Sequence, residues 1–155
     1  MRRVIDSPVG IITLLASEEA ITGLYFGDTK NEIPLGDSPV LDLCEKELAA
    51  YFKGELQHFT VPVIAEGTDF RKKVWEILRR IPYGETASYK DIALSLGSPK
   101  SVRAVGGANH NNPISIIVPC HRVIGASGSL TGYGGGLEAK QWLLELEAKH
   151  KDSEL

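Results

Sequence analysis

The chain has 155 residues, of which 43% are hydrophobic and 24% are charged, so its composition is that of a folded protein rather than a disordered one. This length suits one ordinary domain, or a small N-terminal unit followed by a second one. No run approaches the roughly 18–20 apolar residues that span a bilayer, and residues 1–8 contain no signal-peptide core. We therefore expect a cytoplasmic protein without a membrane partner.

The formal net charge of −3 is distributed unevenly along the chain. Residues 1–68 carry 5 basic and 11 acidic side chains, residues 69–122 carry 9 and 4, and residues 123–155 carry 3 and 5. A positive central block in an acidic chain permits local attraction to phosphate groups, although an asymmetry of this size also arises by chance.

The first 65 residues are expected to form a small α+β unit. Strand-forming runs lie at residues 4–5, 11–15 and 20–26. Apolar residues at helical spacing then predict a helix from residue 41 to 52, with Cys44 on its buried face. Residues 61–63 are predicted to be an edge strand, and residues 65–68 connect this unit to the next.

The remaining residues are expected to be mostly helical. Helices are predicted at residues 69–81, 88–96 and 99–108, with a closing helix from residue 137. Ser88 and Asp91 have the spacing of a capping box at the start of the second of these helices. Because only Gly97 and Ser98 separate the second helix from the third, the pair predicts a helix-turn-helix.

The third helix in this series has unusually small side chains, with Arg103 as its one large side chain reaching outwards. Its small residues are Ala104, Gly106, Gly107 and Ala108. Glycine costs about 1 kcal/mol relative to alanine inside a helix. A close helix crossing or a fraying end would explain this composition. A backbone that must approach a flat or narrow partner also explains it, and the helix-turn-helix context favours this second interpretation.

A reactive cysteine is suggested by the run Pro119-Cys120-His121-Arg122, which follows an apolar stretch at residues 114–118 that predicts a buried strand. A free thiol has a pKa of about 8.5, so a thiolate requires a nearby base or cation, and His121 and Arg122 are candidates. Neighbours on an extended chain point to opposite faces, so His121 reaches Cys120 only through a kink or a bridging water. On this local pattern alone, an inert buried cysteine beside a surface histidine is the better interpretation.

The two cysteines, Cys44 and Cys120, stand 76 positions apart, and neither has a metal-ligand spacing to another cysteine or histidine. Because of this spacing, we expect no metal site. A disulfide between the two cysteines is also disfavoured in a reducing compartment.

The segment from Pro119 to Val123 resembles the active-site signature of the O6-alkylguanine-DNA alkyltransferases, also called methylated-DNA–protein-cysteine methyltransferases. Further motifs in the same order are Ile81-Pro82-Tyr83-Gly84-Glu85-Thr86, Ser88-Tyr89, Arg103-Ala104-Val105-Gly106-Gly107-Ala108, Asn112-Pro113 and Tyr133-Gly134-Gly135-Gly136-Leu137. The similarity runs from about Phe70 to Glu147, whereas the N-terminal 65 residues match only loosely.

The resemblance implies an α+β fold, with a small N-terminal sheet-and-helix domain at residues 1–65. A mostly helical domain with a helix-turn-helix, at residues 66–155, would bind DNA and carry out alkyl transfer. The implied activity is direct-reversal DNA repair. An alkyl group would pass irreversibly from O6-alkylguanine, and from O4-alkylthymine, in double-stranded DNA to Cys120. Such a suicide enzyme is expected to be monomeric, to need no cofactor and to act once.

The family's catalytic roles can be assigned to matching positions. Cys120 resembles the nucleophile, and His121, acting through a water and paired with Glu147, resembles the base that yields the thiolate. Tyr89 resembles the proton donor to the departing guanine, and Asn112 resembles the asparagine that ties the recognition helix to the active-site segment. Without the resemblance, Tyr89 would be assigned to packing and Glu147 to a solvated helix face.

The remaining roles concern DNA and the pocket. Arg103 resembles the arginine that fills the gap left by a flipped nucleotide. Ser88, Ala104, Gly107 and Ala108 are expected to lie against the DNA backbone in the minor groove. The expected pocket residues are Tyr133, Gly134, Val123 and Ser115, and Arg122 is expected to be structural. Gly134 replaces a serine found in some relatives, so the range of accepted alkyl groups is open.

Three alternative functions can be weighed against this one. A non-reactive alkyltransferase-like protein would lack the cysteine that is present at position 120. A thiol hydrolase with a Cys-His pair would turn over a small ester or amide. A helix-turn-helix regulator would read bases in the major groove, which the glycines of the recognition helix disfavour.

Overall fold

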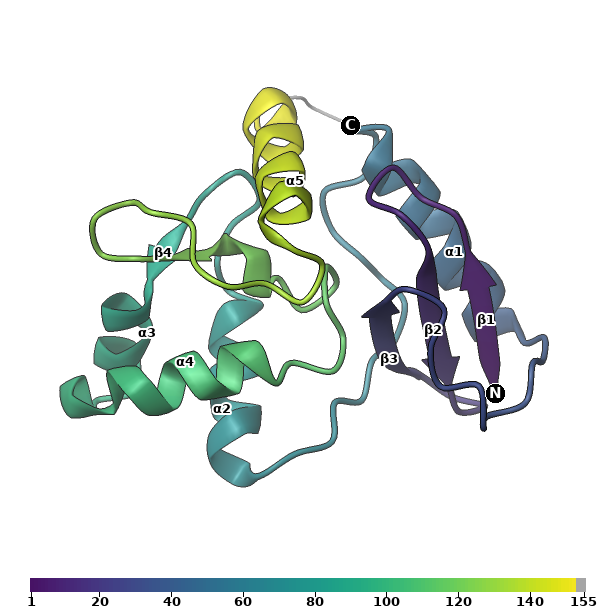
Figure 1. The fold of residues 1–155 in the computed structure, drawn as a ribbon, viewed down its shortest axis with the longest axis horizontal. Helices are drawn as coiled ribbons and strands as arrows, with labels where there is room; N and C mark the ends of the chain where they lie inside the picture. The colour runs from purple at the N-terminus through teal and green to yellow at the C-terminus, as the bar shows by residue number, and fades with distance from the viewer. Residues whose placement is uncertain (153–155) are drawn as a thin grey trace.

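The N-terminal part of the chain is a small antiparallel sheet with a long helix beside it. The computed structural model describes residues 1–152, and the sheet has the strand order β1-β2-β3 (Figure 1). Its elements are β1 (Arg2–Ile5), β2 (Ile12–Ala16), β3 (Ile21–Phe26) and helix α1 (Pro39–Phe52). The three predicted strands and the predicted helix are confirmed, with their first or last residues shifted by one or two positions.

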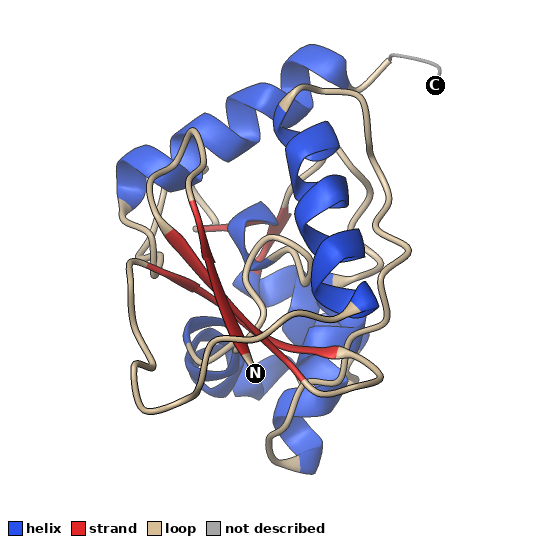
Figure 2. Ribbon diagram, turned by 90° about the vertical axis from the view of Figure 1, so that its right-hand side faces the viewer, coloured by secondary structure: helices blue, strands red, loops and turns tan. Residues whose placement is uncertain are grey.

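Local sequence signals set the ends of these elements. Gly10 adopts a φ of 101°, and its amide bonds to the Ser7 carbonyl at 3.0 Å, which closes the turn between β1 and β2. Helix α1 begins after Ser38, whose side chain accepts a hydrogen bond from the Leu41 amide at 3.1 Å. Figure 2 shows α1 alongside the strands. Its buried hydrophobic residues are Leu41, Cys44, Leu48 and Tyr51.

The C-terminal part is mostly helical. Its helices are α2 (Asp69–Leu78), α3 (Tyr89–Ser95), α4 (Val102–His110) and α5 (Leu137–His150), with a short 3-10 turn at Pro99–Ser101. Ser88 and Asp91 form the predicted capping box of α3, and Gly97, with a φ of 73°, follows its end. Helices α3 and α4 form the predicted helix-turn-helix, and the predicted α+β fold class is confirmed.

Two predicted strands are wrong. Residues 61–63 contain only an isolated bridge, between Val63 and Ile21. Residues 114–118 are buried as predicted, but they form a turn closed by a 3.0 Å hydrogen bond from the Val118 amide to the Ile114 carbonyl. Ile116 has a φ of 71° in this turn, a left-handed conformation that a β-branched residue rarely adopts. An apolar run indicates only that a segment is buried. The backbone conformation of residues 114–118 is set by tertiary hydrogen bonds.

The turn at residues 114–118 is held by backbone hydrogen bonds from the N-terminal sheet. The Leu24 amide of β3 donates to the Pro113 carbonyl at 2.9 Å, and the Ser115 amide donates back to the Leu24 carbonyl at 3.3 Å. A short parallel ladder then joins β4 (Ala87–Ser88), just before α3, to β5 (Val123–Ile124). The segment that carries Cys120 is therefore attached to the N-terminal sheet on one side and to the helix-turn-helix on the other.

A side-chain hydrogen bond fixes α4 against α2. The Trp75 indole on α2 donates to the Ala108 carbonyl at 2.8 Å.

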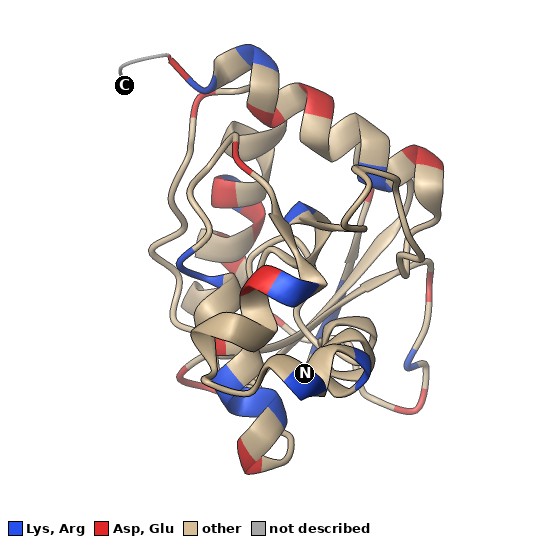
Figure 3. Cartoon of the chain, turned by 90° about the vertical axis from the view of Figure 1, so that its left-hand side faces the viewer, with Lys and Arg blue, Asp and Glu red and all other residues tan. Residues whose placement is uncertain are grey.

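The surface of the molecule carries charges of both signs. Basic and acidic segments are interspersed on the side shown in Figure 3. Within residues 1–152, no helix is both long and apolar enough to cross a membrane.

Candidate active site at Cys120

Cys120 opens a single 3-10 turn, Cys120–Arg122, directly after Pro119. The expectation of an extended chain here is wrong, so the rule that neighbouring side chains point to opposite faces does not apply. The turn buries all three of its side chains, and His121 is 0% exposed. The alternative of a surface histidine beside an inert cysteine is therefore excluded for His121.

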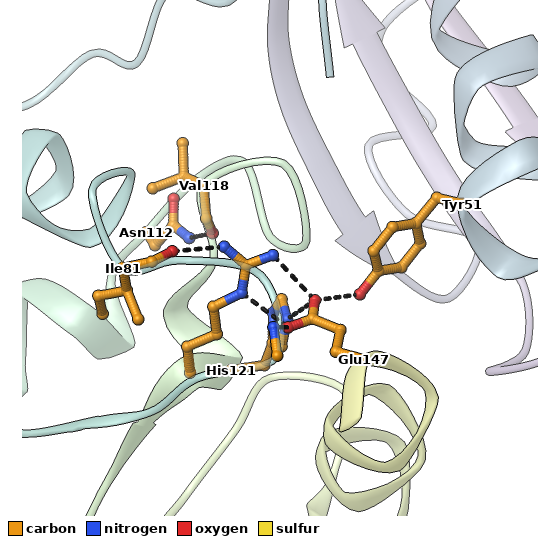
Figure 4. Close-up of polar contacts among 8 residues, drawn as sticks. Tyr51, Ile81, Asn112, Val118, His121 and Glu147 are labelled. Atoms are coloured by element: carbon orange, nitrogen blue, oxygen red, sulfur yellow. Dashed lines mark hydrogen bonds and ion pairs between the residues drawn. The ribbon is translucent and has the colours of Figure 1, made fainter. Parts of the chain in front are cut away.

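The carboxylate of Glu147, on α5, is the centre of a buried polar cluster (Figure 4). Its Oε2 lies 2.7 Å from Nε2 of His121. Arg122 donates from Nε to Oε1 at 2.7 Å and from Nη2 to Oε2 at 3.0 Å, and its Nη1 donates to the Ile81 carbonyl at 2.7 Å. Tyr51 of α1 donates its hydroxyl to Oε2 at 2.6 Å. Glu147 is fully buried and is not on a solvated helix face.

This cluster keeps Glu147 ionised. Burial alone would raise the pKa of the Glu147 carboxyl, but the hydrogen bond from His121 and the hydrogen bonds and charge of Arg122 outweigh burial and hold that pKa far below its usual value. Arg122 supplies the permanent positive charge. Its contacts are those of an anchor, which is the structural role that we assigned to it.

The same contacts indicate the protonation state of His121. Burial, together with the charges of Arg122 and Lys140, lowers the pKa of its imidazole and outweighs the rise caused by the Glu147 carboxylate, so the ring is neutral near pH 7. Because an ionised carboxylate can only accept, Nε2 carries the proton and Nδ1 holds the free lone pair. Nδ1 is buried and has no hydrogen-bond partner among the described residues. His121 is therefore arranged to accept a proton at Nδ1.

The thiol of Cys120 requires such a base. Burial raises the pKa of this thiol, and hydrogen bonds with the side chains of Asn112 and Ser115 and the charge of Lys140 only partly offset that rise. The thiol therefore rests in its protonated form near pH 7, and a thiolate forms only when a base removes its proton.

Asn112 braces the turn that precedes the cysteine. Its Nδ2 donates to the Val118 carbonyl at 2.9 Å, and its Oδ1 accepts from the Ile114 amide at 3.0 Å. These two bonds span the turn from end to end. Asn112 stands two residues after the end of α4, so it joins the recognition helix to the cysteine segment in the position that the resemblance implies.

The sequence did not indicate Lys140 or Thr131. Lys140, on α5, is fully buried, and its Nζ donates to the carbonyls of Val123 at 2.7 Å and Thr131 at 3.2 Å. The Thr131 hydroxyl is hydrogen-bonded to the Tyr89 hydroxyl. Tyr89 is therefore linked to Lys140 through the Thr131 side chain.

A cavity of about 460 Å³ lies against Cys120. Its lining includes three of the expected pocket residues, Tyr133, Gly134 and Ser115, together with Asn112. Val123 and Tyr89 are not among the lining residues, and Val123 is buried in β5, so Val123 is corrected to a supporting position.

One wall of the cavity comes from the N-terminal domain and was not predicted. Its residues are Tyr25, Phe26, Thr29 and Lys30. Phe26 packs edge-on against Tyr133 with ring centroids 5.4 Å apart. The strand pattern identified Phe26 only as part of β3, because a contact with residue 133 has no local signal in the sequence.

The expected DNA-contacting residues divide into two groups. Arg103, Ala104 and Gly107 are exposed on α4. Ala108 is 1% exposed, because the buried face of α4 recurs at Val105 and Ala108, so its assignment to the exposed surface is corrected. The Ser88 hydroxyl accepts a hydrogen bond from the Asp91 amide at 3.0 Å, so in this structure it caps α3.

Two family models match this chain over most of its length. The family model described as "6-O-methylguanine DNA methyltransferase, ribonuclease-like domain" matches residues 1–65, and the DNA binding domain model of the same methyltransferase matches residues 69–149. The chain belongs to the 6-O-methylguanine DNA methyltransferase family. The resemblance seen around Cys120 is therefore confirmed, and it extends to the N-terminal domain.

Relatives of this 6-O-methylguanine DNA methyltransferase family match over nearly the whole chain. A methylated-DNA–protein-cysteine methyltransferase of Methanosarcina acetivorans is 50% identical, covering 93% of this chain and 96% of the relative. One of Mycobacterium tuberculosis is 48% identical, with coverage of 99% and 95%. The crystal structure of Mycobacterium tuberculosis OGT in complex with DNA matches with a TM-score of 0.90 and 49% identity, covering 96% of this chain and 93% of that one.

Proposed function

We propose that this protein repairs DNA by direct reversal, transferring an alkyl group from O6-alkylguanine in double-stranded DNA to the sulfur of Cys120. The observation that carries the proposal is the placement of the Cys120 thiol on a cavity of about 460 Å³, with His121 and Glu147 behind it. The family relatives named methylated-DNA–protein-cysteine methyltransferase support the same reaction.

The proposed chemistry is a single displacement that balances without a cofactor. His121 Nδ1 takes the thiol proton through a water, and the Cys120 sulfur attacks the alkyl carbon. A carbon–sulfur bond forms, the bond from that carbon to O6 breaks, and its electron pair stays with guanine. Tyr89, released from Thr131, gives a proton to the ring, so that neutral guanine leaves. His121 then releases its extra proton to solvent and the Tyr89 phenolate takes one up from solvent, so the net change replaces the thiol proton by an alkyl group and leaves one proton on guanine.

The thioether has no return path in this scheme, so each molecule would act once. We propose that the protein works as a monomer in the cytoplasm and also accepts O4-alkylthymine. The division into a supporting domain at residues 1–65 and a DNA-binding and transfer domain at residues 66–155 is part of the proposal, with residues 153–155 outside the described residues. Roles for the pocket residues Tyr133, Gly134 and Ser115 are likewise proposed.

The defining experiment mixes the protein with a duplex oligonucleotide that contains one O6-methylguanine. Mass mapping should find one added methyl group, on the Cys120 peptide, and an equimolar loss of the lesion. Unmodified protein beside an intact lesion would refute the proposal. Repeated turnover of a small ester or amide would support the thiol hydrolase alternative instead.

DNA is proposed to meet the exposed side of α4, where Ala104 and Gly107 allow close approach to the minor groove and Arg103 fills the space of the flipped nucleotide. Arg103→Ala is expected to slow repair in duplex about 10- to 100-fold, because flipping costs a few kcal/mol, and to leave the reaction with free O6-methylguanine base nearly unchanged. Single-turnover rates with both substrates measure this.

The control for Arg103 is Lys100→Ala, which removes one positive charge from the 3-10 turn just before α4. It should weaken DNA binding through the salt-dependent phosphate attraction alone. An equal loss with duplex and free base in Arg103→Ala would remove the flipping role from Arg103.

The small surface of α4 can be tested at Gly107, where an added Cβ would meet nothing within 4 Å. Gly107→Ala should stabilise the protein by up to about 1 kcal/mol, because alanine has the higher helix propensity. Gly107→Leu should fold and react with free O6-methylguanine, but it should lose at least about tenfold in duplex affinity, because its side chain holds the backbone away from DNA. Thermal unfolding and a salt-controlled binding titration measure the two effects, and tight duplex binding by Gly107→Leu would contradict the proposed surface.

A further inference from the structure

The N-terminal domain contributes one hydroxyl to the polar cluster behind the cysteine. Tyr51 lies on α1, and its hydroxyl bonds to Glu147 Oε2 at 2.6 Å, across 96 positions of sequence (Figure 4). It is fully buried, so water does not compete for this bond. Nothing in the catalytic scheme proposed above uses Tyr51.

The Tyr51 ring is fixed by aromatic neighbours, which makes the position of its hydroxyl well defined. The ring packs against Phe52 and Tyr83 in edge-on contacts, with centroids 5.5 and 6.3 Å apart, and lies 5.3 Å from Phe59. A phenol needs two torsion angles to place its oxygen, and packing on three sides restricts both. The hydroxyl is therefore presented to Glu147 by a rigid support.

Oε2 of Glu147 serves three donors, Tyr51, His121 and Arg122. All three donors bond to the same oxygen, so each hydrogen bond reduces the strength with which that oxygen accepts the other two. The Tyr51 hydroxyl thus limits how strongly Glu147 can stabilise a positive charge on His121, and it fixes the direction in which Oε2 faces the ring.

We propose that Tyr51 is a positioning residue for alkyl transfer, through which the N-terminal domain sets the orientation and the basicity of the His121–Glu147 pair. This inference rests on the proposed function, because it concerns the base that accepts the Cys120 proton. It also gives the N-terminal domain a part in the chemistry besides structural support.

The direction of the effect follows from the groups around His121. The titratable and charged groups packed around this pair come from α1, the segment after α2, the 3-10 turn, the loop before α5 and α5 itself, and they are Tyr51, Tyr83, Cys120, Arg122, Tyr133, Lys140 and Glu147. Removing the Tyr51 hydroxyl leaves every charge in place and frees Oε2 to accept more strongly from His121. The imidazolium form is then stabilised, and His121 becomes protonated at a higher pH.

The test compares the wild-type protein, Tyr51→Phe and Tyr83→Phe. Tyr83→Phe is a matched control, because the buried Tyr83 hydroxyl lies in the same cluster and has no hydrogen-bond partner among the described residues. Single-turnover methyl transfer from O6-methylguanine duplex is measured from pH 5 to 9 with DNA at saturation, and the imidazole signals of His121 are titrated by NMR.

We expect Tyr51→Phe to move the acid limb of the rate profile, and the NMR pKa of His121, upwards by about half a unit to one unit. That shift corresponds to about a three- to tenfold lower rate on the acid side, with the high-pH rate changed much less. Tyr83→Phe should leave the limb where the wild type has it. Coincident limbs and NMR titrations for Tyr51→Phe and wild type would overturn the inference, even if Tyr51→Phe were less stable.

Failure of the inference can be distinguished from failure of the proposed function. If the wild type takes up no methyl group, the function is refuted, and the NMR titration still tests the link between Tyr51 and His121. Should Tyr51→Phe not fold, 3-fluorotyrosine at position 51 keeps the hydroxyl and makes it a stronger donor. The acid limb should then move downwards, and an unchanged or raised limb would contradict the proposed role.

Discussion

With Cys120→Ala, the lesion is expected to stay in the oligonucleotide and no methyl group should appear on the protein. The rate should fall on the order of 10⁴-fold or more, because alanine offers no nucleophile and nothing else in the scheme replaces one. The second cysteine cannot compensate, since Cys44 is fully buried in the N-terminal core, where burial raises its pKa to about 12. Mass spectrometry of the protein and digestion of the DNA measure both products.

The control for this experiment is Cys44→Ala. It should lower the free energy of unfolding by about 1–2 kcal/mol, because it removes a buried sulfur, and it should still take up one methyl group per molecule. Cys120→Ala should retain affinity for the damaged duplex, because the cavity wall and α4 are unchanged. Methyl uptake by Cys120→Ala, at any residue, would contradict the proposed chemistry.

A large loss of stability is expected from Arg122→Met. The substitution keeps an unbranched apolar stem but removes the guanidinium, and with it two hydrogen bonds to Glu147 and one to the Ile81 carbonyl. The buried Glu147 carboxylate then loses the guanidinium that is hydrogen-bonded to it, and breaking a buried ion pair in this way typically costs about 3–5 kcal/mol. Urea unfolding near pH 7 measures the change in the free energy of unfolding.

The stability lost in Arg122→Met should become smaller at low pH. The pKa of Glu147 in the folded protein lies far below that of an unfolded glutamate, about 4.3. Its contribution to stability is therefore fully present above that value and is lost as the pH falls through the folded pKa. The difference between wild type and Arg122→Met should narrow below about pH 4.

A double substitution separates the lost charge from lost packing. Arg122→Met combined with Glu147→Gln removes both charges while an amide still accepts from Tyr51 and His121. The double variant should be more stable than the sum of the two single effects predicts, because neither charge is left alone. Strict additivity would show that Arg122 acts through packing alone.

Elements with a local cause could be predicted from the sequence. The capping box of Ser88 and Asp91, and the glycine that follows α3, depend on residues within one turn of the helix. The turn at residues 114–118 could not be predicted in the same way. Its apolar residues suit a buried strand equally well, and its bonds to Leu24 of β3 come from a segment about 90 positions earlier.

The site divides in a similar way. Cys120, His121 and Asn112 could be located because they stand in motifs that resemble a known family. Tyr51 was placed only within the helix predicted at residues 41–52, since apolar spacing on that helix does not reveal a hydroxyl bond to α5. Lys140 was missed because lysine is almost never buried. One signal was available for it, because Lys140 and Glu147 are seven positions apart and therefore share one face of α5.

The pairing of Leu24 with the turn around Ile114 also bears on how the protein opens and unfolds. Residues 113–115 cannot move away from β3 without breaking hydrogen bonds that belong to the N-terminal sheet. Local opening of the backbone requires little free energy only where few such hydrogen bonds must break. Opening of the backbone at residues 113–115 therefore requires more free energy than opening of a segment without such bonds. The N-terminal sheet in this way restrains the backbone of the turn that precedes Cys120.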